Sequence, residues 1–283
     1  MSGINTSGTP NTQDYSLGRG AIYLAKLNTT TNLPDANGYR HVGNVPAFTI
    51  TMEVETLEHQ SSLHGLKVTD LSVILSQKVS FSFTFDEINF DNLALFFSGE
   101  TGTFSNSVAI AGFAEWDAIP VVKLGRWYDI TDNAGVRVYN ITAANLTVES
   151  PNATTKTLGT DYLVDAVMGR VFFVSAADGG TIADGADVHL TLAANAGAGT
   201  VEEVKSLTQT NDRVALKFIG ENPVNDDVMT EVQIHKTQLK ADGDFSLIGD
   251  EFTTASLTGT AEANTDADAD SPYVTIRTLT VAG

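Results

Sequence analysis

The sequence predicts a mainly β protein with one short helix, at about residues 88–98. Two stretches of alternating apolar and polar residues and one change of hydrophobic period support this prediction. Successive side chains of a strand point to opposite faces, so an alternating stretch indicates a strand with one apolar and one polar face. Four further short β-type segments between residues 121 and 195 indicate a second β region.

The clearest predicted strands are residues 48–55 and 79–86. A sheet made of such strands packs a core on its apolar face and meets water, or a water-filled channel, on its polar face. The apolar faces carry Phe48, Ile50, Met52 and Val54 in the first strand and Val79, Phe81, Phe83 and Phe85 in the second. The polar faces carry Thr49, Thr51, Glu53 and Glu55 in the first and Ser80, Ser82, Thr84 and Asp86 in the second.

A short amphipathic helix is expected directly after the second strand. Asp86 or Asn89 can cap its N-terminus, and Gly99 is the expected stop. The apolar residues recur at helical spacing, at Phe90, Leu93, Ala94, Phe96 and Phe97.

The segment between the two strands, residues 57–77, is too long for a tight turn and is expected to be a long polar excursion. It nevertheless contains leucines and valines that a structureless loop would not need, and exposed apolar patches usually mark contact surfaces. Two interpretations stay open: the segment contacts adjacent subunits, or it folds back onto its own core. The candidate contact residues are Leu57, His59, Leu63, His64, Leu66, Val68, Leu71, Val73 and Leu75.

The predicted domain organisation has three parts. Residues 1–18 form a flexible N-terminal arm, because they are small and polar and lack the basic and apolar regions of a signal peptide. Residues 19–118 and 200–283 form the main β domain. Residues 121–195 form an inserted module, a small sandwich or barrel, which the glycine- and alanine-rich tract Asn195 to Thr200 ends like a linker. We expect synthesis in a cytoplasm.

The composition excludes several kinds of chemistry. The chain has no cysteine, which excludes disulfides, zinc–thiolate sites and cysteine nucleophiles. Its net charge of −19 argues against binding to a nucleic-acid backbone, because such affinity comes mainly from Lys and Arg. The acidity fits either a soluble surface or a surface that must repel DNA. No stretch is long and apolar enough for a transmembrane helix, so no membrane insertion is expected.

Motifs for catalysis or metal binding are lacking in the sequence. Asp266, Asp268 and Asp270 alternate like the first ligands of a calcium loop, but Ser271 and Arg277 stand where an EF-hand needs Gly and Glu. The histidines lack metal-ligand spacing, and neither a nucleophile motif nor a phosphate loop is present. We therefore expect no enzyme activity, no metal and no cofactor.

Roughly half of the chain resembles the major tail tube proteins of long, non-contractile-tailed (siphovirus-type) bacteriophages. The first resembling block carries Gly43 to Phe48, Glu58-His59, Ser61 to Gly65, and Asp86-Glu87 followed by Asn92-Leu93-Ala94. The second block, residues 222–263, resembles the closing part of the same family, in particular at Phe245 to Glu251.

The resemblance implies the tail-tube fold, an antiparallel β-sandwich or barrel with a small helix at its flank. It also implies a structural virion protein whose copies form hexameric rings that stack into a hollow tail tube. Such a tube houses the tape-measure protein, ends at tail-tip and tail-terminator proteins, and conducts double-stranded DNA without binding it specifically. The implied location is the virion tail, assembled in the bacterial host cytoplasm.

In such a tube one polar sheet face lines the lumen, and the resemblance tips the excursion towards contact between subunits. An acidic lining lets DNA slide without sticking. The candidate lining residues are Glu53, Glu55, Ser80, Ser82, Thr84 and Asp86.

The alternative function is a secreted or surface β-sandwich adhesin or carbohydrate-binding protein. The missing export signal and the lack of clustered surface aromatics count against it. The single candidate cluster, Trp116, Trp127 and Tyr128, is expected to belong to a core instead.

Overall fold

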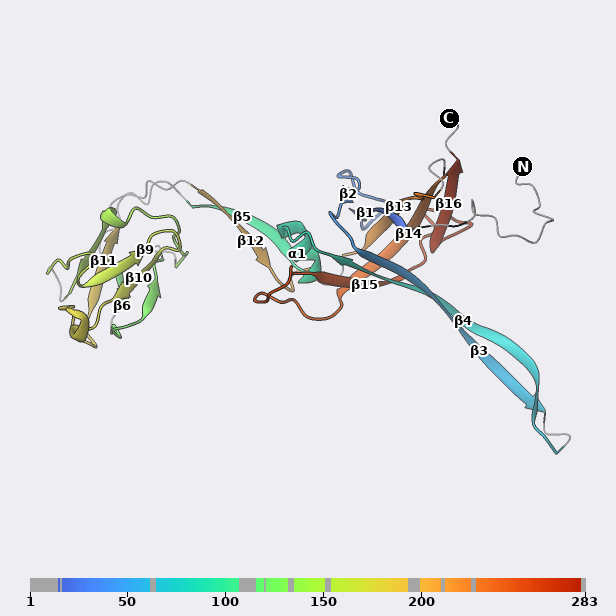
Figure 1. The fold of residues 1–283 in the computed structure, drawn as a ribbon, viewed down its shortest axis with the longest axis horizontal. Helices are drawn as coiled ribbons and strands as arrows, with labels where there is room; N and C mark the ends of the chain where they lie inside the picture. The colour runs from blue at the N-terminus through green and yellow to red at the C-terminus, as the bar shows by residue number, and fades with distance from the viewer. Residues whose placement is uncertain are drawn as a thin grey trace. The chain divides into compact units, whose positions relative to one another are not determined.

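Figure 1 shows the computed structural model of the chain, which describes residues 15, 17–61, 65–106, 116–119, 121–131, 135–150, 154–192, 199–209, 212–224 and 228–280. The chain divides into two compact units. The main unit comprises Met1–Thr101 and Val204–Gly283, and the module comprises Gly102–Glu203. The predicted bounds of the module, 121–195, were therefore too narrow at both ends.

The main unit is built on one antiparallel sheet in the order β2-β1-β13-β14-β15-β4-β3, with β16 pairing with β14 beside β15. The prediction of a mainly β, antiparallel fold with a short helix is confirmed. Its elements are β1 (Arg19–Lys26), β2 (Arg40–His41), β3 (Ala47–Ser61), β4 (Val68–Phe85), α1 (Phe90–Phe96), β13 (Val214–Glu221), β14 (Val228–Ala241), β15 (Ala255–Ala261) and β16 (Val274–Thr280).

The apolar face of this sheet forms the core of the main unit. Phe81, Phe83 and Phe85 of β4 are buried, whereas the alternate hydroxyl residues of that strand stay half-exposed on the other face. The rings of Phe48 on β3 and Phe218 on β13 lie 5.4 Å apart, although these strands are not neighbours in the sheet. The sheet therefore curves around its apolar face, and Phe96 of α1 joins the same core.

The helix lies where it was predicted, and one of its two candidate N-caps is confirmed. Asn89 is the N-cap, and its side chain accepts a hydrogen bond from the Asn92 N–H at 2.9 Å. Asp86 instead accepts hydrogen bonds from the Asn44 amide. At the C-terminus Ser98, not Gly99, takes the left-handed conformation, with φ 47°. The Gly99 N–H then donates to the Ala94 carbonyl at 2.7 Å, which completes a Schellman-type cap.

The predicted excursion between the two strands is wrong in its local structure. β3 and β4 pair from Ala47↔Thr84 to Ser61↔Val68 and form one long hairpin, with register irregularities after Glu55 and His59. Figure 1 shows the outer parts of both strands running on without another element of the main unit beside them.

The module is a small sandwich of two three-stranded sheets, β7-β10-β9 and β6-β11-β8, around a shared core. β6 pairs with β11, so residues 116–118 belong to the module and not, as predicted, to the main domain. Its strands are β6 (Trp116–Ile119), β7 (Trp127–Asp129), β8 (Leu146–Glu149), β9 (Tyr162–Asp165), β10 (Arg170–Phe173) and β11 (Val188–Leu192), with 3-10 turns η2 (Ala143–Asn145) and η3 (Ala176–Asp178).

The predicted core position of Trp127 is wrong. The indole is 44% exposed, whereas the neighbouring Tyr128 packs against the module core. The side chain of Trp116 lies outside the described residues.

Two strands, β5 (Glu100–Asn106) and β12 (Gly199–Lys205), pair with each other, and the boundary between the units falls within both. Most of the predicted N-terminal arm, residues 1–14 and 16, lies outside the described residues. Among the described residues no helix has the length and apolar character needed to cross a membrane.

Candidate assembly surfaces

The outer part of the β3–β4 hairpin, residues 52–61 and 65–78, is here named the hairpin arm. Almost every residue in it is exposed, because the described residues of the main unit cover neither face of this two-stranded ribbon. The arm carries large apolar side chains that are each about half or more exposed: Met52, Val54, Leu57, Leu66, Val68, Leu71, Val73, Ile74 and Leu75. Monomeric proteins rarely leave so many apolar side chains together in water.

Most of the predicted contact residues therefore lie on this arm. Leu57, His59, Leu66, Val68, Leu71, Val73 and Leu75 are all exposed on it, and Leu63 and His64 lie outside the described residues. The interpretation that this segment folds back onto its own core is wrong for the described part.

Polar side chains on the arm interact with one another across the two strands. The Lys78 ammonium lies 3.5 Å from a Glu53 carboxylate oxygen, as the register Glu53↔Lys78 dictates. Ser76 donates to Glu55 at 3.0 Å, and a His59 ring nitrogen lies 2.6 Å from Asp70. These groups are exposed, so each pair contributes well under about 1 kcal/mol. They follow from the register of the ribbon and stabilise it only weakly.

Five of the six predicted lining residues share one sheet face. The pairing places Glu53 and Glu55 on the same side as Ser80, Ser82 and Thr84. Asp86 follows the end of β4 and binds Asn44 instead.

That face is richer in hydroxyls than in charges. Thr49 hydrogen-bonds Ser82 at 2.8 Å, and Thr84 hydrogen-bonds Ser256 on β15, also at 2.8 Å. Because Glu53 has Lys78 beside it, the net negative charge of the face is smaller than the sequence alone indicated.

A second exposed apolar surface lies in the loop between β14 and β15, residues 242–254, here named the apolar loop. Leu247, Ile248 and Phe252 are 84%, 95% and 95% exposed. Phe245 anchors the loop, because its ring lies 5.6 Å from that of Phe96 on α1. Sequence reasoning did not single out this surface, although three large apolar residues within a polar, acidic loop were a usable signal.

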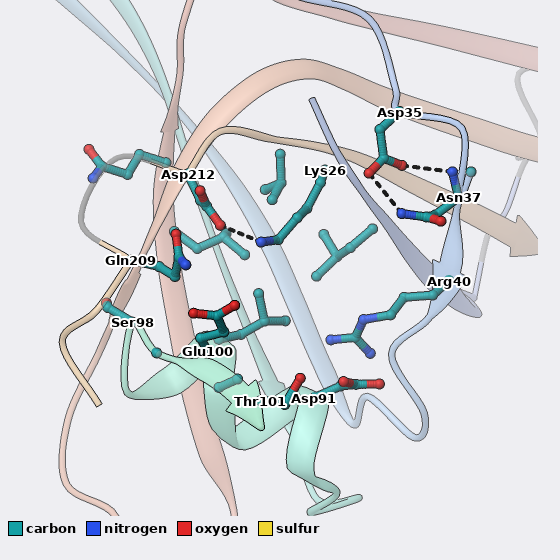
Figure 2. A pocket seen from close by; sticks show the side chains of 18 residues that line it. Lys26, Asp35, Asn37, Arg40, Asp91, Ser98, Glu100, Thr101, Gln209 and Asp212 are labelled. Carbon is teal, nitrogen blue, oxygen red and sulfur yellow. Dashed lines mark hydrogen bonds and ion pairs between the residues drawn. The ribbon is translucent and has the colours of Figure 1, made fainter. Parts of the chain in front are cut away.

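The main unit also contains a pocket of about 570 Å³ beside α1. Figure 2 shows Arg40 and Glu100 reaching into it from different sides, with Lys26 paired to Asp212 at 2.6 Å. The pocket is lined by Leu24, Lys26, Asp35, Asn37, Gly38, Arg40, Asp91, Ala94, Leu95, Ser98, Gly99, Glu100, Thr101, Gln209, Asp212, Val214, Gln238 and Leu239.

Both cations of the pocket, Arg40 and Lys26, have partners within the main unit. Arg40 donates from Nη1 to the Asn92 side chain at 2.9 Å, and burial lowers the pKa of Arg40 while the Asp91 carboxylate partly opposes that shift. Among the described residues no group of three or more His, Asp or Glu side chains is placed to hold a metal ion.

The sequence model of one protein family, described as "Protein of unknown function UCP028589", matches residues 15–277. The chain belongs to this family. The match runs through the hairpin arm, the module and the apolar loop, so all three lie within the part that the family model covers. No curated protein matches the chain.

Proposed function

We propose that this member of the family is a structural subunit that assembles with copies of itself into stacked rings, forming a phage tail tube of the siphovirus type. The hairpin arm is the observation that carries this proposal. It leaves nine large apolar side chains exposed on a ribbon that the described part of the main unit does not cover.

The energetics favour burial of the arm against a neighbour. Fully burying one Val, Leu or Ile side chain is worth about 1.5–3 kcal/mol, so covering nine half-exposed ones contributes on the order of 10 kcal/mol. Association itself costs about 4–15 kcal/mol in lost freedom. One arm contact is thus marginal, and assembly needs several contacts per subunit. A closed ring supplies them.

The two apolar surfaces differ, which supports head-to-tail assembly. The hairpin arm and the apolar loop have different sequences and shapes, so a contact between the two would be heterologous. A heterologous contact gives a ring if the rotation closes, and a helical filament if it does not. A tube of stacked rings needs closing contacts within each ring and continuing contacts between rings.

Strand edges offer a further means of joining subunits. β3 is the last strand of the main sheet, and in the described part of the chain β16 pairs only with β14. Open edges present unpaired backbone N–H and C=O groups to another chain. We propose that sheets of adjacent copies join there, and that the hydroxyl-rich face with Glu53 and Glu55 lines the lumen.

The net charge of −19 supports a conduit for DNA, because a surface this acidic offers a passing polyanion few binding sites. The tape-measure, tail-tip and tail-terminator proteins are the proposed partners, and the virion tail is the proposed location. Both follow from the tail-tube resemblance.

A reporter experiment tests the role of the arm. The chain has no cysteine, so Leu71→Cys on the arm and Val136→Cys on the module each provide one site for an environment-sensitive dye. Raising the protein concentration should shift the emission of the arm label to the blue and leave the module label unchanged. An arm label that stays in water while the protein sediments as a monomer would argue against the proposal, and equal shifts at both sites would indicate aggregation.

A further inference from the structure

The outward face of the β7-β10-β9 sheet carries an apolar row that the module core does not use. The register places Phe172 of β10 opposite Trp127 of β7 and Leu163 of β9. The Trp127 and Phe172 rings lie 5.3 Å apart, and Trp127 and Leu163 are 44% and 43% exposed. The residues on either side of Phe172 in β10, Val171 and Phe173, point inward and are fully buried. The row is therefore a surface feature.

A polar row lies one step further along the same three strands. Arg170 stands opposite Asp129 and Asp165 in the register. Its guanidinium donates to Asp165 at 2.9 Å and lies 4.7 Å from the centroid of the Trp127 ring. Asp129 in turn pairs with Arg137 at 2.9 Å. These contacts hold the indole and both carboxylates in place before any ligand arrives, which reduces the entropy lost on binding.

The size of this face argues against a protein partner. Three strands about 4.8 Å apart and about four residues long, at about 3.3 Å per residue, present on the order of 200 Å². A stable protein–protein interface covers about 800 Å² on each partner. The charges of the polar row balance, because two aspartates face two arginines, so the face does not select a polyanion such as DNA.

The two rows match the chemistry of a sugar ring. A pyranose has an apolar face of C–H groups, which packs flat against an aromatic ring, and hydroxyls at its rim, which both donate and accept hydrogen bonds. Fixed carboxylates accept from such hydroxyls, and guanidinium groups donate to them. Hydrogen bonds from the Met168 N–H and Arg170 hold the pKa of Asp165 below its ordinary value, so it stays an acceptor at neutral pH.

We propose that the module binds a neutral saccharide, with a sugar ring on Trp127 and Phe172 and its hydroxyls on Asp129, Asp165 and Arg170. This inference rests on the module surface alone and does not depend on assembly of the main unit.

The test uses the full chain on an array of bacterial and plant-type neutral glycans, followed by titration of the best hit. Binding is measured by tryptophan fluorescence and by saturation-transfer NMR. Trp127→Ala should weaken binding about tenfold or more, and Trp127→Tyr should retain part of it. Asp165→Asn tests the polar row and should also weaken binding.

The matched control is Tyr273→Ala, which removes an aromatic side chain of similar exposure, 47%, from the main unit. It should bind like the unaltered chain, and circular dichroism should show that every variant is folded. Absence of binding to every neutral glycan on the array would overturn the proposal. Binding that survives Trp127→Ala would show that the sugar sits elsewhere.

Discussion

Arg40 of β2 donates from Nη1 to the side-chain carbonyl oxygen of Asn92 on α1 at 2.9 Å, and this hydrogen bond joins the edge strand to the helix. Asn92 is fully buried, and its amide nitrogen also donates to the carbonyls of Val42 and Glu87. One side chain thus holds β2, the backbone at Val42 and Glu87, and α1 together.

Replacing Asn92 by Ala should therefore lower the free energy of unfolding of the main unit by about 3 kcal/mol, because the three hydrogen bonds of this buried side chain are worth about 1 kcal/mol each. Urea denaturation followed by circular dichroism measures this loss. Asn37→Ala, at an exposed position that bonds mainly to Asp35, is the control and should cost much less. Equal effects of the two substitutions would contradict the assigned role.

The C-terminal cap of α1 gives a stabilising prediction. Ser98 holds φ 47°, a conformation that costs a residue with a Cβ about 1 kcal/mol and costs glycine almost nothing. Ser98→Gly should raise the melting temperature, and Ser98→Ala should not. Gly99→Ala should lower it, because a Cβ there would meet the Lys205 carbonyl oxygen at 2.5 Å. A lower melting temperature for Ser98→Gly would show that the cap is built differently.

Buried His235 makes the stability of the main unit depend on pH. Burial lowers the pKa of His235 below 6.5, opposed by Asp268 and reinforced by Arg277. The folded chain therefore binds fewer protons than the unfolded chain, so the contribution of this residue is complete above pH 6.5 and is lost as the pH falls below it. The loss approaches at most about 1.4 kcal/mol per pH unit.

Denaturation at pH 7.5 and at pH 5.5 tests this dependence. His235→Gln should reduce the difference in unfolding free energy between the two pH values. An unaltered difference in His235→Gln would assign the pH dependence to other groups.

Charge on the proposed lining can be tested with DNA. Polymers of the chain that carry Glu53→Lys with Glu55→Lys should bind duplex DNA in a salt-dependent way, because added lysines neutralise phosphates. In virions the same change should slow genome delivery. Cosedimentation with duplex DNA measures the binding, and the neutral pair Glu53→Gln with Glu55→Gln is the control. If the lysine variant does not bind DNA, the placement of these two residues in the lumen is contradicted.

The sequence predicted the strands of the main core well, because alternation in β4 directly reports which side chains face the core. The sequence analysis did not predict the hairpin arm, although apolar residues continue to alternate through Leu71, Val73 and Leu75 to Val79. The length of the segment predicts a loop, and a two-stranded ribbon without a core does not follow from length alone.

Other errors have similar physical causes. In a strand, Trp127 lies on the same face as the polar Asp129 and on the opposite face from Tyr128. The alternation in β7 therefore already placed the indole on the outer face. The extent of the module depends on the pairing of β6 with β11, which are about 70 residues apart. Local patterns carry no information about such long-range pairing.

Electron microscopy of the concentrated full chain beside an arm variant, with sedimentation of both, tests self-assembly through the hairpin arm most directly. The variant carries Leu57→Ser, Leu71→Ser and Val73→Ser, and the control carries serine at the exposed module residues Val121 and Val136. We predict rings or hollow tubes for the unaltered chain and the control, and a folded monomer for the arm variant. Tubes formed equally well by the arm variant, or a monomer for the unaltered chain at every concentration, would contradict the account.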